Sequence, residues 1–94
     1  MSVKANNLAV WALKHSGSQS KATEDFQKLD QMCRTLCYPL AIFLNIGSCE
    51  THLGGYGGGF KDRLHAFAIP GVSGSKIKYA HFIDGGLIEK DIAL

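Results

Sequence analysis

Long apolar stretches, clustered positive charges and charged residues in general are scarce in this sequence. Charged residues make up 19% of the 94 positions, and the ten Lys and Arg residues are scattered, leaving a net charge of +2. The basic stripe typical of independent nucleic-acid-binding domains is therefore missing, and nucleic acid is a weakly supported partner. The longest early apolar run, residues 8–13, is far shorter than the roughly 18 residues that a membrane span needs. We expect no membrane partner.

Cysteine is also scarce. Cys33, Cys37 and Cys49 cannot all pair within one chain, and we expect no secretory signal before them, which predicts a reduced, cytoplasmic protein. The three thiols and His52 are chemically suitable zinc ligands. Cys33 and Cys37, however, fall on the apolar side of an expected helix, where a free thiol behaves as a small hydrophobic group. We therefore expect no metal and no cofactor.

Apolar residues are plentiful, at 46% of the chain. This content indicates a globular protein rather than a disordered one, and the length predicts a single domain over residues 1–94. A chain this short buries only about 60 to 65% of its unfolded surface. Some apolar surface should therefore remain for a partner, and we expect a homo-oligomer, since self-association is the simplest way to cover it.

The apolar pattern predicts an α/β (α+β) fold that starts with a βαβ unit. Residues 7–15 and 40–46 are short apolar runs typical of strands buried on both faces or nearly so. Between them, residues 21–37 have the spacing of an amphipathic helix, with Ser20 as its N-cap. Asp25 falls with the polar residues of that helix. We expect the two strands to be parallel because a helix connects them.

The second half of the chain predicts a hairpin. Residues 63–69 and 76–83 read as strands, and the turn-forming residues between them favour antiparallel pairing. Residues 84–86 form another expected turn, and residues 87–94 form either a last short strand or a loose tail. The whole is one principal helix packed on a small mixed sheet.

A glycine-rich loop is the most unusual local feature. Five of the eleven glycines lie within residues 54–59, where only Tyr56 interrupts them. Loops that cradle phosphate run from a strand into a helix, whereas a strand is expected after this one, so a flexible hairpin connector is the favoured interpretation. Lys61 and Arg63 would place positive charge beside an anion if the loop does bind one. The ligand-binding candidates in this region are Gly55, Tyr56, Gly57, Lys61 and Arg63.

Two histidines are further binding candidates. His65 and His81 lie on the two arms of the expected hairpin, where they would approach one another, with Asp84 three residues beyond His81. Such a cluster binds a divalent ion or transfers a proton. Hydrogen-bonded structural histidines are the commoner outcome on strands, and we favour that interpretation.

Residues 7–47 also carry a resemblance to a known family. The first strand ends in the triplet Ala12-Leu13-Lys14, a long helix follows, and a very apolar strand comes next. This order resembles the second half of the core of the PD-(D/E)XK nuclease superfamily, in which a strand ends in an acid-x-lysine triplet. The resemblance implies metal-dependent phosphodiesterase or nucleic-acid-binding activity, with Lys14 as the catalytic residue.

The sequence departs from that pattern in two ways. Ala12 stands where the superfamily has a metal-binding acid, and the six residues before Asn7 leave no room for the strand that carries its first Asp. Hydrolysis with a divalent metal needs oxygen ligands to hold the ion. We therefore expect a small cytoplasmic binding or interaction protein, not an enzyme, and keep a degenerate nuclease fold as the alternative. In general style the chain resembles small bacterial proteins carried on mobile elements.

Overall fold

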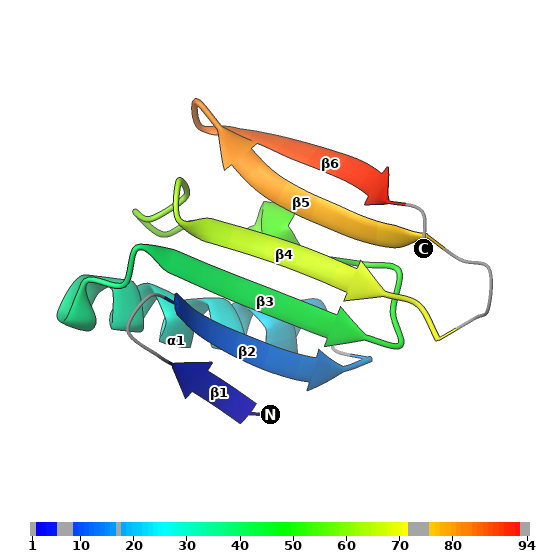
Figure 1. The fold of residues 1–94 in the computed structure, drawn as a ribbon, viewed down its shortest axis with the longest axis horizontal. Helices are drawn as coiled ribbons and strands as arrows, with labels where there is room; N and C mark the ends of the chain where they lie inside the picture. Colours follow the sequence, from blue (N-terminus) through cyan, green and yellow to red (C-terminus); the bar gives the residue numbers. More distant parts are fainter. Residues whose placement is uncertain (1, 6–8, 17, 72–75, 93–94) are drawn as a thin grey trace.

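The strands of the sheet lie in the same order as they occur in the chain (Figure 1). The computed structural model describes residues 2–5, 9–16, 18–71 and 76–92. Within them it has one α-helix, one short 3-10 helix and a six-stranded sheet. The elements are β1 (Ser2–Ala5), β2 (Ala9–His15), α1 (Gln19–Leu36), β3 (Leu40–Ile46), η1 (Leu53–Gly55), β4 (Leu64–Ile69), β5 (Ile77–Ile83) and β6 (Gly86–Ile92).

The sheet is mixed, as the sequence predicts. β2, β3 and β4 run parallel, and the remaining neighbours, β1 with β2, β4 with β5 and β5 with β6, run antiparallel. The βαβ unit of β2, α1 and β3 and the β4–β5 hairpin are both confirmed. Most of the predicted connector of that hairpin, residues 72–75, lies outside the described residues.

The helix is confirmed with shifted ends. It begins two residues earlier than predicted because Ser18, and not Ser20, is the N-cap: its backbone is extended and its Oγ accepts a 3.4 Å hydrogen bond from the Lys21 N–H. At the other end Cys37 adopts a left-handed conformation with φ 58°, and its N–H bonds the carbonyl of Cys33. Pro39 follows and cannot extend the helix.

One side of α1 packs on the sheet and forms the core. Phe26 is 1% exposed and meets Phe43 of β3 edge to face, with ring centroids 4.9 Å apart. Burying a side chain of this size stabilises a fold by about 1.5 to 3 kcal/mol. Small residues on the facing strands let the helix approach closely; they are Ala12, Ala41, Ala66 and Ala80, all buried.

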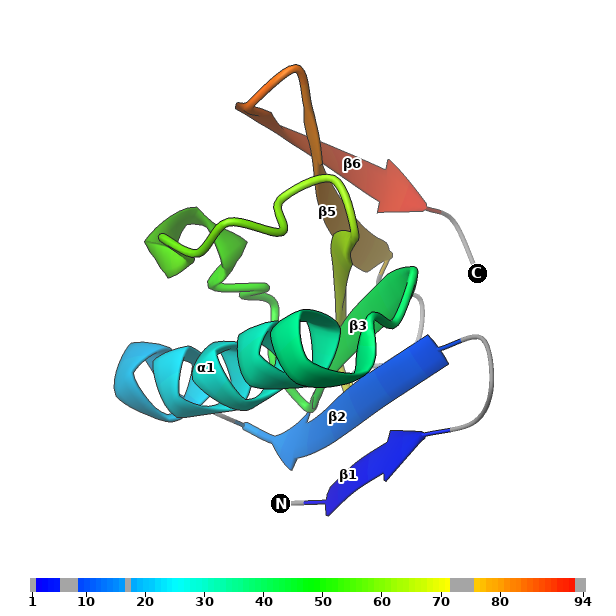
Figure 2. The same cartoon turned by 90° about the vertical axis from the view of Figure 1, so that its left-hand side faces the viewer.

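The glycine-rich loop is not a hairpin tip, contrary to the sequence interpretation. It belongs to residues 47–63, which join β3 to β4, and these two strands are parallel. Parallel strands need a crossover that returns the chain to the same end of the sheet. The crossover lies on the same side of the sheet as α1 (Figure 2).

The two outer strands complete the sheet. β1 was not predicted, because a four-residue segment has too little pattern to recognise; it pairs with β2 in the space before residue 7. Residues 87–94 were left open between strand and tail, and the structure has β6 there as far as Ile92. The predicted turn at residues 84–86 is a two-residue hairpin loop, in which Asp84 and Gly85 both have positive φ, as in the turns that best fit strand twist.

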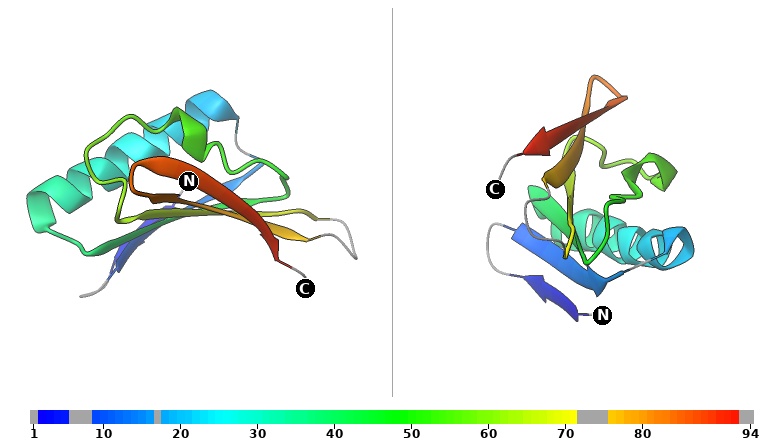
Figure 3. Two further views of the ribbon diagram at one scale, coloured as in Figure 1. Left: turned by 90° about the horizontal axis from the view of Figure 1, so that it is seen from above. Right: turned by 90° about the vertical axis from the view of Figure 1, so that its right-hand side faces the viewer.

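The other side of the sheet carries no further element in the described part of the chain (Figure 3). Strand side chains alternate between the two faces, so half of the residues on β2–β5 point away from α1. β3 and β4 alternate strictly between buried and half-buried residues. On β2 and β5 the half-buried residues that point away from α1 are Trp11, Leu13, Ile77, Tyr79 and His81. The half-buried set defines a surface that the fold itself leaves uncovered.

Candidate functional site

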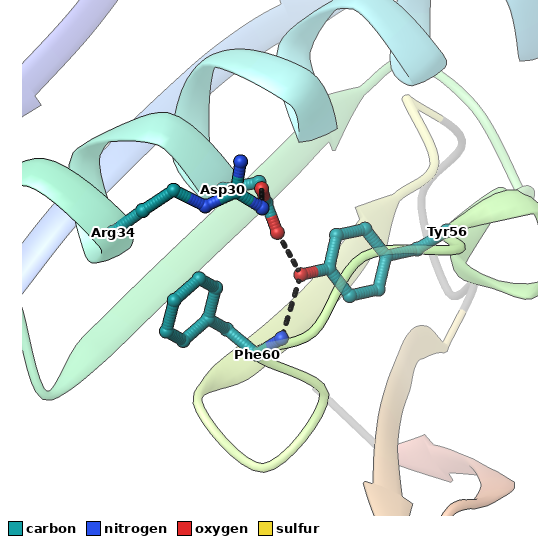
Figure 4. A network of polar contacts seen from close by, with 4 residues as sticks. All are labelled: Asp30, Arg34, Tyr56 and Phe60. Carbon is teal, nitrogen blue, oxygen red and sulfur yellow. Dashed lines mark hydrogen bonds and ion pairs between the residues drawn. The ribbon is translucent and has the colours of Figure 1, made fainter.

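The glycine-rich loop is tied to the helix by a polar network. The Tyr56 hydroxyl donates a 2.6 Å hydrogen bond to Asp30 Oδ1 and accepts one of 3.0 Å from the Phe60 N–H (Figure 4). Asp30 also pairs with Arg34 one turn later, at 2.9 Å. Burial and then the bond to Asp30 raise the pKa of Tyr56 to about 12. The hydroxyl therefore remains a donor at any physiological pH.

One glycine of the loop is required by this network. A Cβ on Gly58 would collide with Asp30 Oδ1 and with the Tyr56 hydroxyl, whereas a Cβ on Gly57 or Gly59 would meet nothing within 4 Å. At Gly55 the colliding group is the flexible end of Gln19. Gly58 is thus the position where the backbone approaches Asp30 and Tyr56 too closely for a side chain, whereas Gly57 and Gly59 have space for one.

A cleft of about 460 Å³ lies between α1 and the loop. Of the residues predicted to bind a ligand, Gly55, Tyr56 and Gly57 line it, together with Asp30 and Arg34. The structure therefore brings three of the loop candidates together beside one ion pair.

The two predicted cations, Lys61 and Arg63, do not line this cleft. Arg63 stacks 5.1 Å from the centroid of the Phe60 ring and donates to the Tyr38 carbonyl at 3.3 Å. Lys61 lies 5.3 Å from the centroid of the Phe82 ring and lines a separate hollow with Asp62 and Asp84. Neither lines the cleft, so the cleft lacks the positive pair that an anion site at this loop would use.

Lys14 lies under the helix. Its Nζ is 3.7 Å from Asp25 Oδ2, and the two side chains are 14% and 1% exposed. The prediction that Asp25 faces solvent was wrong, and its two carboxylate oxygens have no hydrogen-bond partner among the described residues. Burial raises the pKa of Asp25, and the nearby Lys14 opposes part of that rise. Lys14 therefore compensates a buried carboxylate.

The sequence prediction also placed both Cys33 and Cys37 on the apolar helix face. Cys33 is buried there, but Cys37 is the exposed C-cap, and Cys49 is exposed as well. In the described part of the chain, no three His, Cys, Asp or Glu side chains gather as a set of metal ligands.

The second candidate site is the uncovered face of the sheet, which we call the open face. Register and alternation assign to it alternate residues of four strands. A shallow apolar hollow of about 340 Å³ lies on it, lined by Trp11, Ile42, Leu44, Phe67, Ile69 and Ile77. Leaving out Ala9, His15, Leu40 and Ile83 at the strand ends, the open face consists of Trp11, Leu13, Ile42, Leu44, Ile46, His65, Phe67, Ile69, Ile77, Tyr79 and His81.

An aromatic strip crosses the open face on β4 and β5. His65 and His81 pair in register with ring centroids 6.0 Å apart, so the predicted approach of the two histidines is found. Tyr79 stacks on His81 at 4.7 Å and on Phe67 at 4.8 Å, and its hydroxyl is 2.6 Å from His65 Nδ1. We call these four residues, Phe67, Tyr79, His81 and His65, the ring strip.

The histidines of the ring strip are in an apolar setting. Burial, and secondarily the neighbouring His81, lower the pKa of His65. The Nε2 atom of His81 is buried and has no hydrogen-bond partner among the described residues. Asp84, predicted as the third member of this group, lines the hollow that contains Lys61.

Sequence reasoning found the two histidines and Tyr56 but missed Asp30, Phe67 and Trp11. Helical spacing alone does not say which carboxylate the loop reaches. In the described ranges, no helix is both long and apolar enough to cross a membrane. In comparisons with protein-family models, curated proteins and solved structures, nothing matches this chain.

Proposed function

We propose that this protein is a small interaction module that assembles with a second copy of itself through the open face. The observation that carries this proposal is the composition of that face: its residues on β2–β5 include no Asp, Glu, Lys or Arg. An uncharged apolar sheet face of this extent is typical of the inner surface of a two-layer structure. Here one layer is the chain itself, and the second layer must come from a partner.

A second copy of this chain presents an apolar sheet face that can pack on the open face. Sheets pack face to face at a spacing of about 10 Å when both inner faces are apolar. The chain's own open face meets that requirement, and a two-fold axis would place the same patch on both sides of the interface. Nucleic acid fits poorly, because its phosphates need Lys and Arg on the contact surface.

The size of the face also suits a dimer. Four strands of about seven residues, about 4.8 Å apart with a rise of about 3.3 Å per residue, present a flat area of about 440 Å². The accessible surface of a corrugated face exceeds its flat area, and β1 and β6 extend the sheet on both sides. Counted in the same way, all six strands give about 600 Å², compared with the roughly 800 Å² per partner of a standard stable interface.

Pairing through the edge of the sheet is less favourable. In a two-fold antiparallel pair, residues of the same face oppose each other, so a register centred on Lys90 of β6 would set Lys90 against Lys90 and Glu89 against Asp91. Registers centred on Glu89 or Asp91 would oppose two carboxylates. Like charges directly opposite each other destabilise strand pairing, so pairing centred on the charged residues 89–91 of β6 is disfavoured relative to assembly through the face.

We also propose that the protein works in the cytoplasm. The three cysteines are free, and Cys37 and Cys49 are exposed, which suits a reducing compartment. The nuclease-like alternative stays a prediction. It rests on Lys14, which is engaged with Asp25 beneath α1, and no observation favours it over assembly.

Sedimentation velocity on two matched variants tests the proposed assembly. Leu44→Lys puts a charge at the centre of the open face, whereas Leu36→Lys makes the same change at a helix residue that is 57% exposed and outside that face. We expect the wild type and Leu36→Lys to sediment as dimers and Leu44→Lys as a folded monomer. Equal dimerisation of all three proteins, or a wild type that stays monomeric at high micromolar concentration, contradicts the proposal. Binding to lipid vesicles by a monomeric wild type would assign the face to a membrane surface instead.

A further inference from the structure

The ring strip places two imidazoles inside the proposed interface. His65 and His81 face each other across β4 and β5, and both belong to the open face. His65 Nδ1 is engaged with the Tyr79 hydroxyl, and His81 Nε2 has no partner among the described residues. Both rings are already half-buried in one copy, and a second copy seated on the face would remove the water that remains around them.

Among the described residues, the elements packed against the ring strip supply no anion. On β3 the neighbour of His65 is Ile42, and on β6 the register places Ile88 opposite His81 and Lys90 opposite Tyr79. His15, a further histidine on this side of the strands, is at the exposed end of β2. The nearest described cationic group of the open side is therefore Lys90, which would repel a protonated imidazole.

The nearby charged groups that do not belong to the open face are engaged elsewhere. Glu89 pairs with Lys78 at 3.9 Å, and Asp91 is on the same side of β6 as Glu89. Asp62 and Asp84 line the hollow beside Lys61. Arg63, two residues before His65, contacts Phe60 and Tyr38. A two-fold partner brings the same open face, whose described residues include no carboxylate.

We infer that acid dissociates this assembly, because His65 and His81 must both be neutral for two open faces to pack together. This inference rests on the proposed function and adds its regulation. A buried charge without a counter-ion is strongly unfavourable, so protonation favours the separated copies, in which water solvates the rings. Burial already lowers the pKa of His65 within one copy, so this ring protonates in the separated copies only below the pH range of a free imidazole. The switch therefore operates on the acid side of neutral pH.

The dimer dissociation constant measured by sedimentation equilibrium at pH 7.5 and pH 5.5 tests the inference. Each imidazole that must stay neutral weakens association up to about tenfold per pH unit below its pKa in the separated copies. Since every dimer contains two copies of each ring, we expect the dissociation constant to rise about tenfold or more at pH 5.5. Far-UV circular dichroism at both pH values shows whether each copy stays folded.

Two variants separate the pH response of the dimer from its assembly. His65→Asn with His81→Phe removes both titrating rings but keeps a hydrogen-bonding side chain beside Tyr79 and an aromatic ring in the stack. We expect a dimer whose dissociation constant changes less than about twofold with pH. His15→Asn is the control, and it should retain the full pH response. A dimer insensitive to pH overturns the inference alone, as does dissociation that occurs only with loss of the fold or persists in the double variant. A monomer at pH 7.5 overturns the proposed function as well.

Discussion

Tyr56 and Asp30 are 26 residues apart in the chain, and a 2.6 Å hydrogen bond joins the hydroxyl of one to the carboxylate of the other. This bond connects the glycine-rich loop to the middle of α1. Tyr56 is 7% exposed and its ring lies 6.1 Å from that of Phe26, edge to face. The loop is therefore an anchored cover over the core, and its glycines serve different purposes at different positions.

Alanine substitutions in the loop should therefore have unequal effects. Gly58→Ala forces apart Tyr56 and Asp30, and we expect it to lower the free energy of unfolding by about 1 to 3 kcal/mol. Gly57→Ala and Gly59→Ala enter open space and should change it by less than about 0.5 kcal/mol. Urea denaturation measures all three. Equal effects at the three positions would mean that the network does not hold the loop.

Removing the hydroxyl of Tyr56 tests the same network from its other end. Tyr56→Phe keeps the ring in the core but leaves Asp30 and the Phe60 N–H without this partner. We expect a loss of about 1 to 2 kcal/mol in the free energy of unfolding. In a spectrophotometric titration of the wild type, one tyrosine should ionise at about pH 12, and that step should be missing from the variant. A titration curve with an unchanged late step would assign it to another tyrosine.

The buried carboxylate of Asp25 predicts a pH dependence of stability. Its folded pKa is raised above 3.8, so the stability linked to this group is fully present below pH 3.8 and is lost as the pH rises through the folded pKa. Asp25→Asn does not titrate, and its stability relative to the wild type should increase between pH 3.5 and pH 7. Glu24→Gln, an exposed neighbour on the same helix, is the control for removing one negative charge. A constant difference between Asp25→Asn and the wild type across this range would contradict the raised pKa.

Nuclease activity is not expected. Ala12 supplies no carboxylate beside Lys14, and Lys14 is paired with Asp25. Incubation with plasmid and single-stranded DNA in magnesium or manganese should give no cleavage above that of Lys14→Ala. Cleavage that persists through repurification and disappears in Lys14→Ala would favour the nuclease-like alternative.

Local patterns predicted much of the fold. The limits of β3 agree with the predicted strand at residues 40–46, because Pro39 and Gly47 bracket a run that is apolar except for one Asn. The helix followed from its apolar spacing. The direction of β4 relative to β3 was not predictable in the same way, because the crossover between them contains only the short η1 helix and so lacks the signal that identified the βαβ unit.

The open face was missed for a related reason. Leu44 and Phe43 are both apolar, although one points away from α1 and the other into the core. Strands with apolar residues on both faces read as strands buried on both faces, and the sequence prediction followed that rule. Asp25 shows the opposite difficulty, since a charged residue at a helix position is expected at the surface unless its partner on another strand is known.

The contacts between two copies test the central claim most directly. In a mixed sample of isotope-labelled and unlabelled protein at pH 7.5, filtered nuclear Overhauser spectra report only contacts between copies. We predict intermolecular contacts from the Leu44 methyl groups and the Phe67 ring to the open face of the other copy, and none from Leu36 on α1. Intermolecular contacts confined to α1 or to β6, or none at all at millimolar concentration, would contradict assembly through the open face.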